Sequence, residues 1–363
     1  MKNDIYNLKA IILIFCAIGL VILYSASSTI ASSMFSNYQY FFINQSIRLF
    51  IGLVFLLFLS LIDYRIYRKY YKIILYLCWC LIFLGYLTSQ NLPTSRGIIL
   101  FGKNIITTSD LSKLGLIIFL ASFIEINRKK INDIKLLFSN LIPYVLLTLL
   151  MIFFQPDMST TFTISLILLS MIYIAGINFK YIASILFFSS IIVVIKIIST
   201  PFQKSRFLNW YYGLDDGQSA ASILSLSNGG VLGSGLGESL FKKGLLPAVH
   251  TDFILPIIGE EFGFIGITAI FILFFLFLFF SIRILQKIPD TFGFFLGVGI
   301  VLNIIFYFLI NSAYVVGVFP TTGLPLPFIS YGGSHLVITL ASMGILFNIA
   351  KQVLNKKVVS HLE

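Results

Sequence analysis

Long apolar runs separated by short polar connections organise the 363-residue chain. A helix needs about 20 apolar residues to cross the roughly 30 Å hydrocarbon core of a bilayer. Ten runs reach or approach that length: 8–25, 46–62, 71–88, 111–126, 137–154, 159–177, 179–199, 262–285, 292–318 and 333–350. We therefore predict an all-α polytopic membrane protein with ten transmembrane helices, in which residues 1–363 form one integral membrane domain.

The composition agrees with this pattern, since 58% of the residues are hydrophobic and 11% are charged. A soluble core is excluded by such a balance. The run 8–25 is too long for the apolar part of a signal peptide and lacks a small-residue processing site, so we expect it to remain a helix. All three cysteines, Cys16, Cys78 and Cys80, fall in apolar runs and offer no disulfide framework. Packed or lipid-facing thiols are favoured over a metal pair at 78 and 80.

The net charge of +11 would suit a nucleic-acid partner, but its distribution indicates a membrane. With a cytoplasmic N-terminus, the inner segments hold 16 of the 25 basic and 6 of the 14 acidic residues, a net of +10 against +1 outside. This is the positive-inside bias. It predicts that both termini are cytoplasmic, that anionic lipids are attracted to the inner face, and that no nucleic acid binds.

One connection is long: about fifty residues, 201–251, lie between predicted helices seven and eight on the outer face. A loop of that length usually carries function. Its glycine-rich stretch 233–237 has neither a preceding strand nor a following Lys-Ser pair, so it fails as a nucleotide-binding fingerprint. Irregular backbone here is expected to re-enter the protein or line a cavity, because bilayer physics allows it only where protein or water covers it.

The end of this loop carries a cluster of ionisable residues just before the apolar run at Phe262. Ionisable groups at a bilayer edge are usually functional, and Asp252 is the leading candidate, with a plain helix cap as the alternative. Glu260 or Glu261 is expected either to coordinate metal or to pair with a buried cation, or to face water. His250, like the later His335, is favoured as a hydrogen-bonding residue over a metal ligand. The outer catalytic region is thus about 201–261.

Three other outer segments carry candidate residues. Asp110 and Lys113 are three apart and share a face where the fourth helix begins. Asp110 suits an N-terminal cap as well as a substrate contact, whereas Lys113 opposes the helix dipole and needs an anion nearby. Asp157 suits a cap at the sixth helix. The segment 319–334 has three prolines, three glycines and no charge, so it either lines a substrate cavity or serves as a scaffold.

Four blocks, in order along the chain, resemble a known family. They are YSAS at 24–27, QPDMSTT at 155–161, LPAVHTDFILPIIGEEFGFIG at 246–266 and PTTGLPLPFISYGGS at 320–334. This pattern is similar to the SEDS (shape, elongation, division and sporulation) proteins, the peptidoglycan polymerases of FtsW and RodA type. PTTG and YSASS resemble the FtsW branch, which acts in division, more than the RodA branch.

The resemblance implies ten transmembrane helices and a glycosyltransferase on the outer face of the bacterial cytoplasmic membrane. Its substrate would be lipid II, polymerised with inversion and with undecaprenyl pyrophosphate as the leaving group. A divalent cation (Mg or Mn), a class B penicillin-binding protein as transpeptidase partner and other divisome proteins are also implied. The remaining alternatives are a RodA-like elongation polymerase, a lipid II flippase and a non-catalytic scaffold for the transpeptidase.

Carried over residue by residue, the resemblance makes Asp252 the catalytic carboxylate, which takes the proton of the attacking hydroxyl or holds that hydroxyl. Basic side chains or a metal would stabilise the leaving pyrophosphate. The expected substrate-binding residues are Lys113, Asp110, Arg96, Arg206, His250, Glu261 and Ser330, and the metal candidates are Asp252, Glu260 and Glu261. The chain departs from the family pattern in four places: Gly97 replaces a Trp after Arg96, an Asp replaces a Glu at 110, Ala248 replaces a Glu, and QPDMS differs from the family's EPDLG at Gln155 and Ser159.

Overall fold

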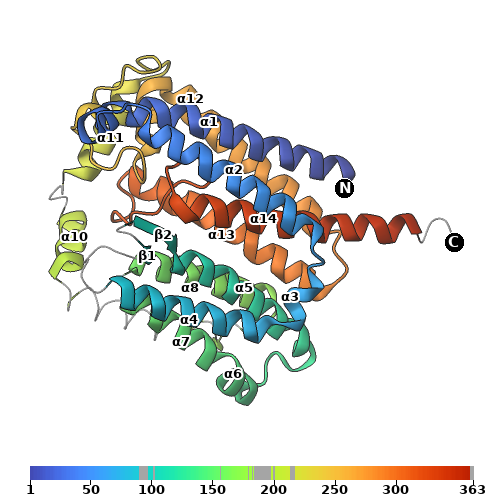
Figure 1. The fold of residues 1–363 in the computed structure, drawn as a ribbon. Coiled ribbons are helices and arrows are strands. Elements are labelled where there is room, and N and C mark those ends of the chain that lie inside the picture. Colours follow the sequence, from blue (N-terminus) through green and yellow to red (C-terminus); the bar gives the residue numbers. More distant parts are fainter. Residues whose placement is uncertain are drawn as a thin grey trace.

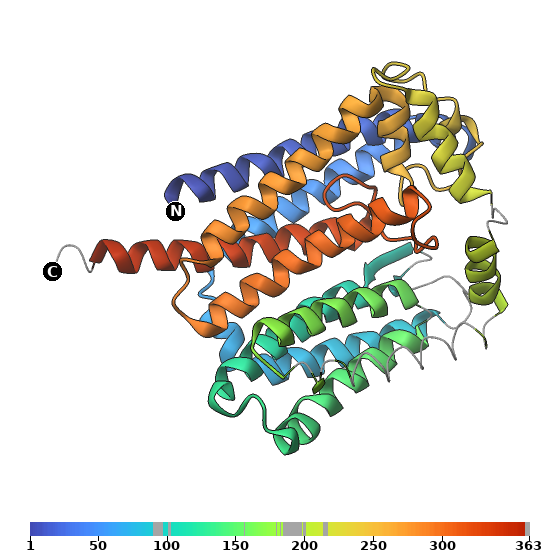
Figure 2. The same cartoon turned by 180° about the vertical axis from the view of Figure 1, so that it is seen from behind.

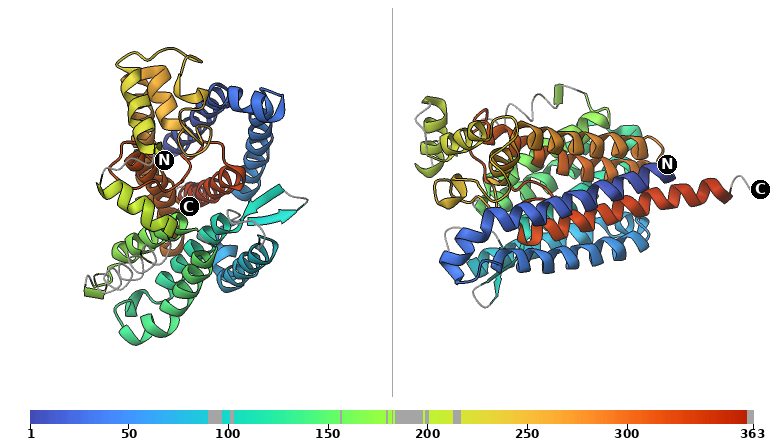
Figure 3. Two further views of the ribbon diagram at one scale, coloured as in Figure 1. Left: turned by 90° about the vertical axis from the view of Figure 1, so that its left-hand side faces the viewer. Right: turned by 90° about the horizontal axis from the view of Figure 1, so that it is seen from above.

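A computed structural model describes residues 1–89, 97–100, 103–155, 157–178, 180–181, 183, 198, 201–212 and 217–359. Its long helices lie lengthwise beside one another in a bundle (Figures 1 and 2). The start of α1 and the end of α14 lie at one end of this bundle. The short helices α10 and α11 and the two strands lie at the other end, as the side view in Figure 3 also shows.

The helices are α1 (Lys2–Phe35), α2 (Tyr40–Leu61), α3 (Arg65–Lys69), α4 (Tyr71–Ser89), α5 (Thr108–Ile126), α6 (Ile134–Asn140), α7 (Ile142–Phe154), α8 (Met158–Ile174), α10 (Pro201–Tyr212), α11 (Gln218–Gly229), α12 (Ile254–Leu285), α13 (Thr291–Val315) and α14 (Gly333–Val359). Single 3-10 turns, η1 and η2, cover Arg128–Lys130 and Phe241–Lys243, and the strands are β1 (Gly97–Leu100) and β2 (Lys103–Thr107).

Nine of the ten predicted membrane segments coincide with helices. Within the described residues, seven spans are long and apolar enough to cross a bilayer: α1, α2, α4, α6 with α7, α12, α13 and α14. Helix α8 is a shorter apolar helix, and the predicted segment 179–199 lies almost wholly outside the described residues. A multi-pass membrane protein is therefore confirmed, and the count of ten helices stays a prediction.

Small residues allow the central helices to approach closely. Helix α2 packs along α14, where a Cβ built on Gly344 would lie 2.4 Å from the carbonyl oxygen of Leu56. On the other helix, a Cβ on Gly52 would lie 2.6 Å from the side chain of Leu340. Helix association in bilayers depends on such close packing, because lipid is as apolar as the side chains and gives no hydrophobic drive.

The chain is not purely helical, which corrects the all-α expectation. Strands β1 and β2 form an antiparallel hairpin in which Gly97 pairs with Thr107 and Leu100 with Lys103. Isoleucine-rich runs favour strands, and a short hairpin ahead of α5 was hidden by the dominant apolar pattern. The hairpin ends at Thr107, directly before α5, so it delivers this residue to the start of that helix.

Helix α12 begins earlier than predicted and is broken. It starts at Ile254 rather than at 262, and Gly263 interrupts it with φ 67° and ψ −161°. Glu260 and Glu261 therefore lie inside the helix, where both are buried. Their expected place at a membrane boundary stays a prediction. The earlier start leaves Asp252 two residues before the helix.

The glycine-rich segment, residues 229–237, packs against this break. The N–H groups of Ser234 and Gly235 donate to the carbonyl oxygens of Glu260 (2.9 Å) and Glu261 (3.0 Å), and the N–H of Phe264 donates to Gly230 (2.9 Å). Backbone groups freed by the break are thus paired, as a low-dielectric environment requires. A Cβ at Gly233 would lie 2.2 Å from the Glu261 carbonyl oxygen, so these glycines serve close backbone contact.

Candidate functional site

A polar cavity of about 300 Å³ lies where α5, α8 and α14 begin. Its walls combine these helix starts with α2, α13 and the loop before α14. The lining residues are Arg48, Thr107, Ser109, Asp110, Asp157, Thr160, Tyr307, Gly323, Leu324, Pro325, Tyr331, Gly332, Gly333, Ser334 and His335. The loop rich in proline and glycine therefore lines a cavity, which was one of the two roles expected for it.

Thr107 joins the start of α5 to the start of α14. Its N–H donates to the Ser334 hydroxyl at 2.7 Å, and its own hydroxyl donates to Oδ2 of Asp110 at 2.5 Å. Thr107 is the N-cap residue of α5, and Asp110 is the third residue of the helix. An acid in the first turn is favourable to the helix dipole. Asp110 is thus stabilised both by the hydroxyl of Thr107 and by the dipole of its own helix, α5.

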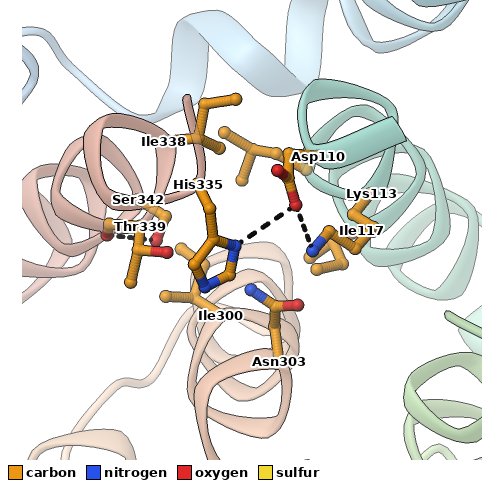
Figure 4. A pocket seen from close by; sticks show the side chains of 10 residues that line it. Asp110, Lys113, Ile117, Ile300, Asn303, His335, Ile338, Thr339 and Ser342 are labelled. Carbon is orange, nitrogen blue, oxygen red and sulfur yellow. Dashed lines mark hydrogen bonds and ion pairs between the residues drawn. The ribbon is translucent and has the colours of Figure 1, made fainter. Parts of the chain in front are cut away.

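Beneath the cavity, Asp110 and Lys113 form a buried ion pair (Figure 4). The Lys113 ammonium lies 2.6 Å from Oδ1 of Asp110 and also donates to the Tyr307 hydroxyl. The Nδ1 atom of His335 lies 3.3 Å from the same Asp110 oxygen. The His335 ring stacks on Tyr307, with centroids 4.8 Å apart. Lys113 thus has its anion, and it does not line the cavity itself, although its partners Asp110 and Tyr307 both do.

Asp157 is the cap of α8, as expected from the sequence. Its Oδ1 accepts from the N–H of Thr160 at 3.2 Å, and its Oδ2 accepts from the Ser109 hydroxyl at 2.9 Å. The second bond ties the start of α8 to the start of α5. This carboxylate is buried yet lines the cavity, so structural and substrate roles are compatible at this position.

Asp252 does not line the cavity itself, but its backbone is tied to a residue that does. Its carbonyl oxygen accepts from Asn311 at 3.0 Å and from the Tyr314 hydroxyl at 2.8 Å. The same two side chains bond the carbonyl of Leu324, which lines the cavity. A Cβ built on Gly323 would lie 3.2 Å from the Asp252 carboxylate. The glycine therefore leaves room for this carboxylate beside the cavity.

A backbone hydrogen bond joins the two motif loops. The N–H of Tyr331 donates to the carbonyl oxygen of His250 at 2.8 Å. The His250 ring packs between Phe41 and Tyr331, with centroids 4.4 and 5.7 Å away. Burial lowers the pKa of His250 to about 4, so the ring is neutral near pH 7. His250 is absent from the cavity lining, and its expected contact with the substrate stays a prediction.

Arg48 is a cavity residue that the sequence reading missed. Its guanidinium lies 4.7 Å from the centre of the Tyr331 ring. Its Nη1 atom is buried and has no hydrogen-bond partner among the described residues. A buried donor without a partner is costly, and an anion in the cavity would satisfy it. The available signal was an arginine inside an apolar run, which is a functional marker in membranes.

Glu260 organises the loop before α12. Its carboxylate accepts from Asn228 (2.8 Å), from the N–H of Leu240 (2.9 Å) and from the hydroxyls of Ser225 (3.2 Å) and Ser239. These donors compete with any cation for its oxygens. A metal role for Glu260 is therefore not supported by its surroundings.

Glu261 pairs with a buried cation, one of the two roles foreseen for these acids. Its Oε1 lies 3.0 Å from Lys242 and accepts from the Ser25 hydroxyl at 2.6 Å. This ties α1 to η2 and α12. Glu261 does not line the cavity, and neither does Ser330, whose hydroxyl accepts from the N–H of Leu326 at 2.9 Å. Both residues stabilise the loops around the site, and their expected contacts with the substrate stay predictions.

The substrate-binding roles that the resemblance implies for two arginines stay predictions. Arg96 lies outside the described residues, and only the backbone of Arg206, in α10, is described. Within the described part of the chain, no group of three or more His, Cys, Asp or Glu side chains is placed to hold a metal ion. The described residues therefore do not form a metal site made of protein ligands alone.

The fold and this cavity define a polytopic membrane protein with a polar site at the bundle end away from its termini. The family model described as cell cycle protein, of FtsW/RodA/SpoVE type, matches residues 6–355. The chain belongs to that family, which confirms the resemblance found in its motifs.

Individual relatives agree with this assignment. The chain is 36% identical over 346 residues to a probable peptidoglycan glycosyltransferase FtsW of Geobacter sulfurreducens, covering 92% of each chain. It is 34% identical over 351 residues to the stage V sporulation protein E of Bacillus subtilis, covering 95% of this chain and 96% of that one. A solved chain, from work on the structural coordination of polymerization and crosslinking by a peptidoglycan synthase complex, superposes with a TM-score of 0.80. That chain is 21% identical, and the match covers 96% and 98% of the two chains.

Proposed function

We propose that this protein is a peptidoglycan glycosyltransferase that polymerises lipid II into glycan strands for the division septum. The observation that carries the proposal is the Asp252 carboxylate beside a polar cavity that also holds a buried arginine donor. The family assignment supports the reaction class, and relatives named FtsW favour the division role over that of a RodA-like elongation polymerase.

In this reaction the 4-hydroxyl of the acceptor sugar attacks the anomeric carbon of the donor. The new glycosidic C–O bond forms as the bond to the pyrophosphate oxygen breaks, and undecaprenyl pyrophosphate leaves. Asp252 accepts the hydroxyl proton, the task of a carboxylate on the attacking face in inverting sugar chemistry. The fixed backbone carbonyl of Asp252 limits where its side chain can reach, which favours a defined geometry for attack.

Arg48 is our candidate for the pyrophosphate. Its Nη1 donor is buried in the cavity wall and lacks a partner in the described part of the protein. Arginine suits phosphate because its planar group donates two parallel hydrogen bonds. The ring of Tyr331 fixes the plane of the guanidinium, so little side-chain freedom is lost when the substrate binds.

A divalent cation, Mg or Mn, would bind together with the substrate and not to the protein alone. Magnesium is usually held by one or two carboxylates together with substrate phosphates and water. Glu260 and Glu261 accept from several protein donors and do not line the cavity. Asp252 lies beside Gly323, which lines the cavity, so it is our candidate for this carboxylate. The cation would supply positive charge at the leaving pyrophosphate. The described residues do not form a complete site, so no step is assigned to it.

We further propose that the protein lies in the bacterial cytoplasmic membrane with both termini inside and the cavity on the outer face. The charge bias and the position of the termini at the bundle end away from the cavity support this orientation. A class B penicillin-binding protein and other divisome proteins are the proposed partners. The superposition on a chain from a peptidoglycan synthase complex supports the first of these.

Purified protein in detergent, supplied with labelled lipid II and Mg²⁺ or Mn²⁺, tests the activity. Glycan strands are expected without any other enzyme. Detergent removes the need for flipping, so a flippase makes no polymer and neither does a scaffold. Transport of lipid II across sealed vesicles without polymer formation would favour the flippase instead.

Labelling of intact cells tests the orientation separately. A cysteine introduced at Ser219, in α11, is expected to react with an impermeant thiol reagent. A cysteine at Lys129, in η1, is expected to stay protected until the membrane is opened. The reverse pattern would place the cavity inside the cell and overturn the proposal for lipid II.

A further inference from the structure

A second, much smaller cavity lies directly below Asp110 (Figure 4). Its volume is about 10 Å³, and Asp110 and Lys113 from α5, Asn303 from α13 and His335 from α14 contribute to its wall. That volume is about the space one water molecule needs, and a buried water requires two or more polar partners. The cavity is therefore large enough for a single water and too small for a substrate.

Two polar atoms at this cavity lack partners. Nε2 of His335 and Oδ1 of Asn303 are both buried, and neither finds a hydrogen-bond partner within the described ranges of the chain. Both residues line the cavity. Buried polar atoms are nearly always paired with protein or with ordered water. Two orphaned atoms on one water-sized cavity point to the same missing partner.

The contact with Asp110 fixes which ring nitrogen donates to it. Asp110 already accepts from Lys113 at 2.6 Å, so it is a carboxylate and the Nδ1 of His335, at 3.3 Å, must donate to it. In a neutral ring with its hydrogen on Nδ1, Nε2 is an acceptor.

We propose that one water molecule fills this cavity, donating one hydrogen to Nε2 of His335 and the other to Oδ1 of Asn303. Two orphaned acceptors match the two donors of a single water. The water holds the ring of His335 so that Nδ1–H stays directed at Asp110. Asn303 and His335 are then positioning residues for the Asp110 carboxylate, which lines the large cavity. Their effect on lipid II rests on the proposed function, whereas the water and the tautomer do not.

The two orientations of the His335 ring differ in the contacts that they give Asp110. If no donor held Nε2, the imidazole could rotate by 180° about its Cβ–Cγ bond. Nδ1 would then leave Asp110, which would lose one of its partners. The stacking of His335 on Tyr307, at an interplanar angle of 18°, keeps the ring in its plane but cannot distinguish its two edges. The water held by Asn303 makes that distinction.

Nitrogen NMR of detergent-solubilised protein labelled with ¹⁵N-histidine tests the proposal without any activity. The chain has three histidines, and a His335→Gln variant identifies the His335 signals. A neutral ring with hydrogen on Nδ1 and a hydrogen-bonded Nε2 is expected. In Asn303→Leu, which removes the amide, the Nε2 signal should move toward the value of a free acceptor. A doubly protonated ring, hydrogen on Nε2, or an unchanged Nε2 signal in the variant would each overturn the proposal.

The kinetic arm uses the same variants. Asn303→Leu should raise the KM for lipid II about tenfold, the effect of weakening one buried hydrogen-bonded contact, with a smaller change in kcat. Asn348→Leu is the matched control, since Asn348 is a buried asparagine of α14 that bonds the N–H of Tyr64 and the carbonyl of Ser60. It should lower thermal stability without altering KM or the His335 signals. Equal KM changes in the two variants would contradict a positioning role, and a wild-type protein that makes no glycan would refute the proposed function alone.

Discussion

Lys113 and Asp110 form an ion pair of 2.6 Å in the first turns of α5, with side chains only 3% and 10% exposed. The sequence left two anions for Lys113: Asp110 or the pyrophosphate of the substrate. The structure supplies Asp110, and the lysine lies on the far side of this carboxylate from the large cavity. A direct contact between Lys113 and pyrophosphate would need this pair to open, so holding Asp110 is its first role.

Removing one partner of this pair should cost more than removing both. Lys113→Met leaves a buried carboxylate without its cation, and we expect a loss of about 3–5 kcal/mol in the free energy of unfolding. Lys113→Met combined with Asp110→Asn should recover more than half of that loss. Chemical denaturation in detergent measures the cycle. The exposed pair Arg68–Glu125, at 3.0 Å, is the matched control and should couple by less than about 1 kcal/mol. Additive effects at 110 and 113 would contradict a paired state.

Asp252 should be indispensable for polymerisation but not for folding. Asp252→Asn removes the proton acceptor while keeping the shape, so glycan synthesis should fall by at least about 100-fold, the usual share of a general base. The backbone carbonyl that Asn311 and Tyr314 hold is unchanged, and the melting temperature should stay close to wild type. Asp133→Asn, which alters the exposed cap of α6, should retain full activity. Substantial synthesis by Asp252→Asn would remove the catalytic assignment.

Arg48 should determine the affinity for the lipid pyrophosphate. Arg48→Ala is expected to raise the KM for lipid II about 10- to 100-fold, because charge-assisted hydrogen bonds contribute roughly 1.5–3 kcal/mol. Arg48→Lys should retain part of the affinity, as a charge without the planar fork. Arg65, which also lies over a tyrosine ring but at an exposed position, provides the control. If Arg65→Ala and Arg48→Ala behave alike, the cavity donor has no special role.

The glycine-rich segment offers a pair of substitutions that separate contact from backbone strain. Gly233 and Gly237 have φ values of 83° and 89°, so alanine costs similar backbone strain at both. Only at Gly233 does the added Cβ meet the Glu261 carbonyl, at 2.2 Å, whereas Gly237 faces open space. Gly233→Ala should therefore lower the melting temperature clearly more than Gly237→Ala. Equal losses in thermal unfolding would show that the segment does not pack against the break in α12.

The apolar pattern was sufficient to place nine helices, seven of which belong to spans long enough to cross a bilayer, because bilayer thickness fixes the length of a spanning helix. It failed at α12, where the start was placed at Phe262 although the helix begins at Ile254. Two adjacent glutamates suggested that the helix begins after them. They are instead buried inside the helix because loop donors and Lys242 satisfy them. Partners that lie 19 or more residues away cannot be read from a local pattern.

The site itself was predictable where a local rule applied. Asp157 caps α8, and Asp110 and Lys113 share one face of α5, as spacing indicated. Ser330 and His250 belong to specific motifs, yet the first supports a turn and the second packs among aromatic rings. Motif membership therefore identified the right loops without identifying which side chains in them face the cavity. Arg48 belongs to no motif and lies in the wall helix α2, so the loop motifs could not identify it.

The segment that contacts the break in α12 and the groups that hold Asp252 are synthesised at different times. The segment that covers the break, 229–235, is made just before α12 itself, so this helix can enter the bilayer with its exposed backbone already paired. The groups that hold Asp252, namely Asn311, Tyr314 and the loop around Gly323, emerge from the ribosome about sixty to seventy residues later. The nascent chain thus covers the break in α12 first. The groups that fix Asp252 are complete only after α13 and the loop that follows it have been made, so a product truncated before α13 would be a membrane protein without this arrangement.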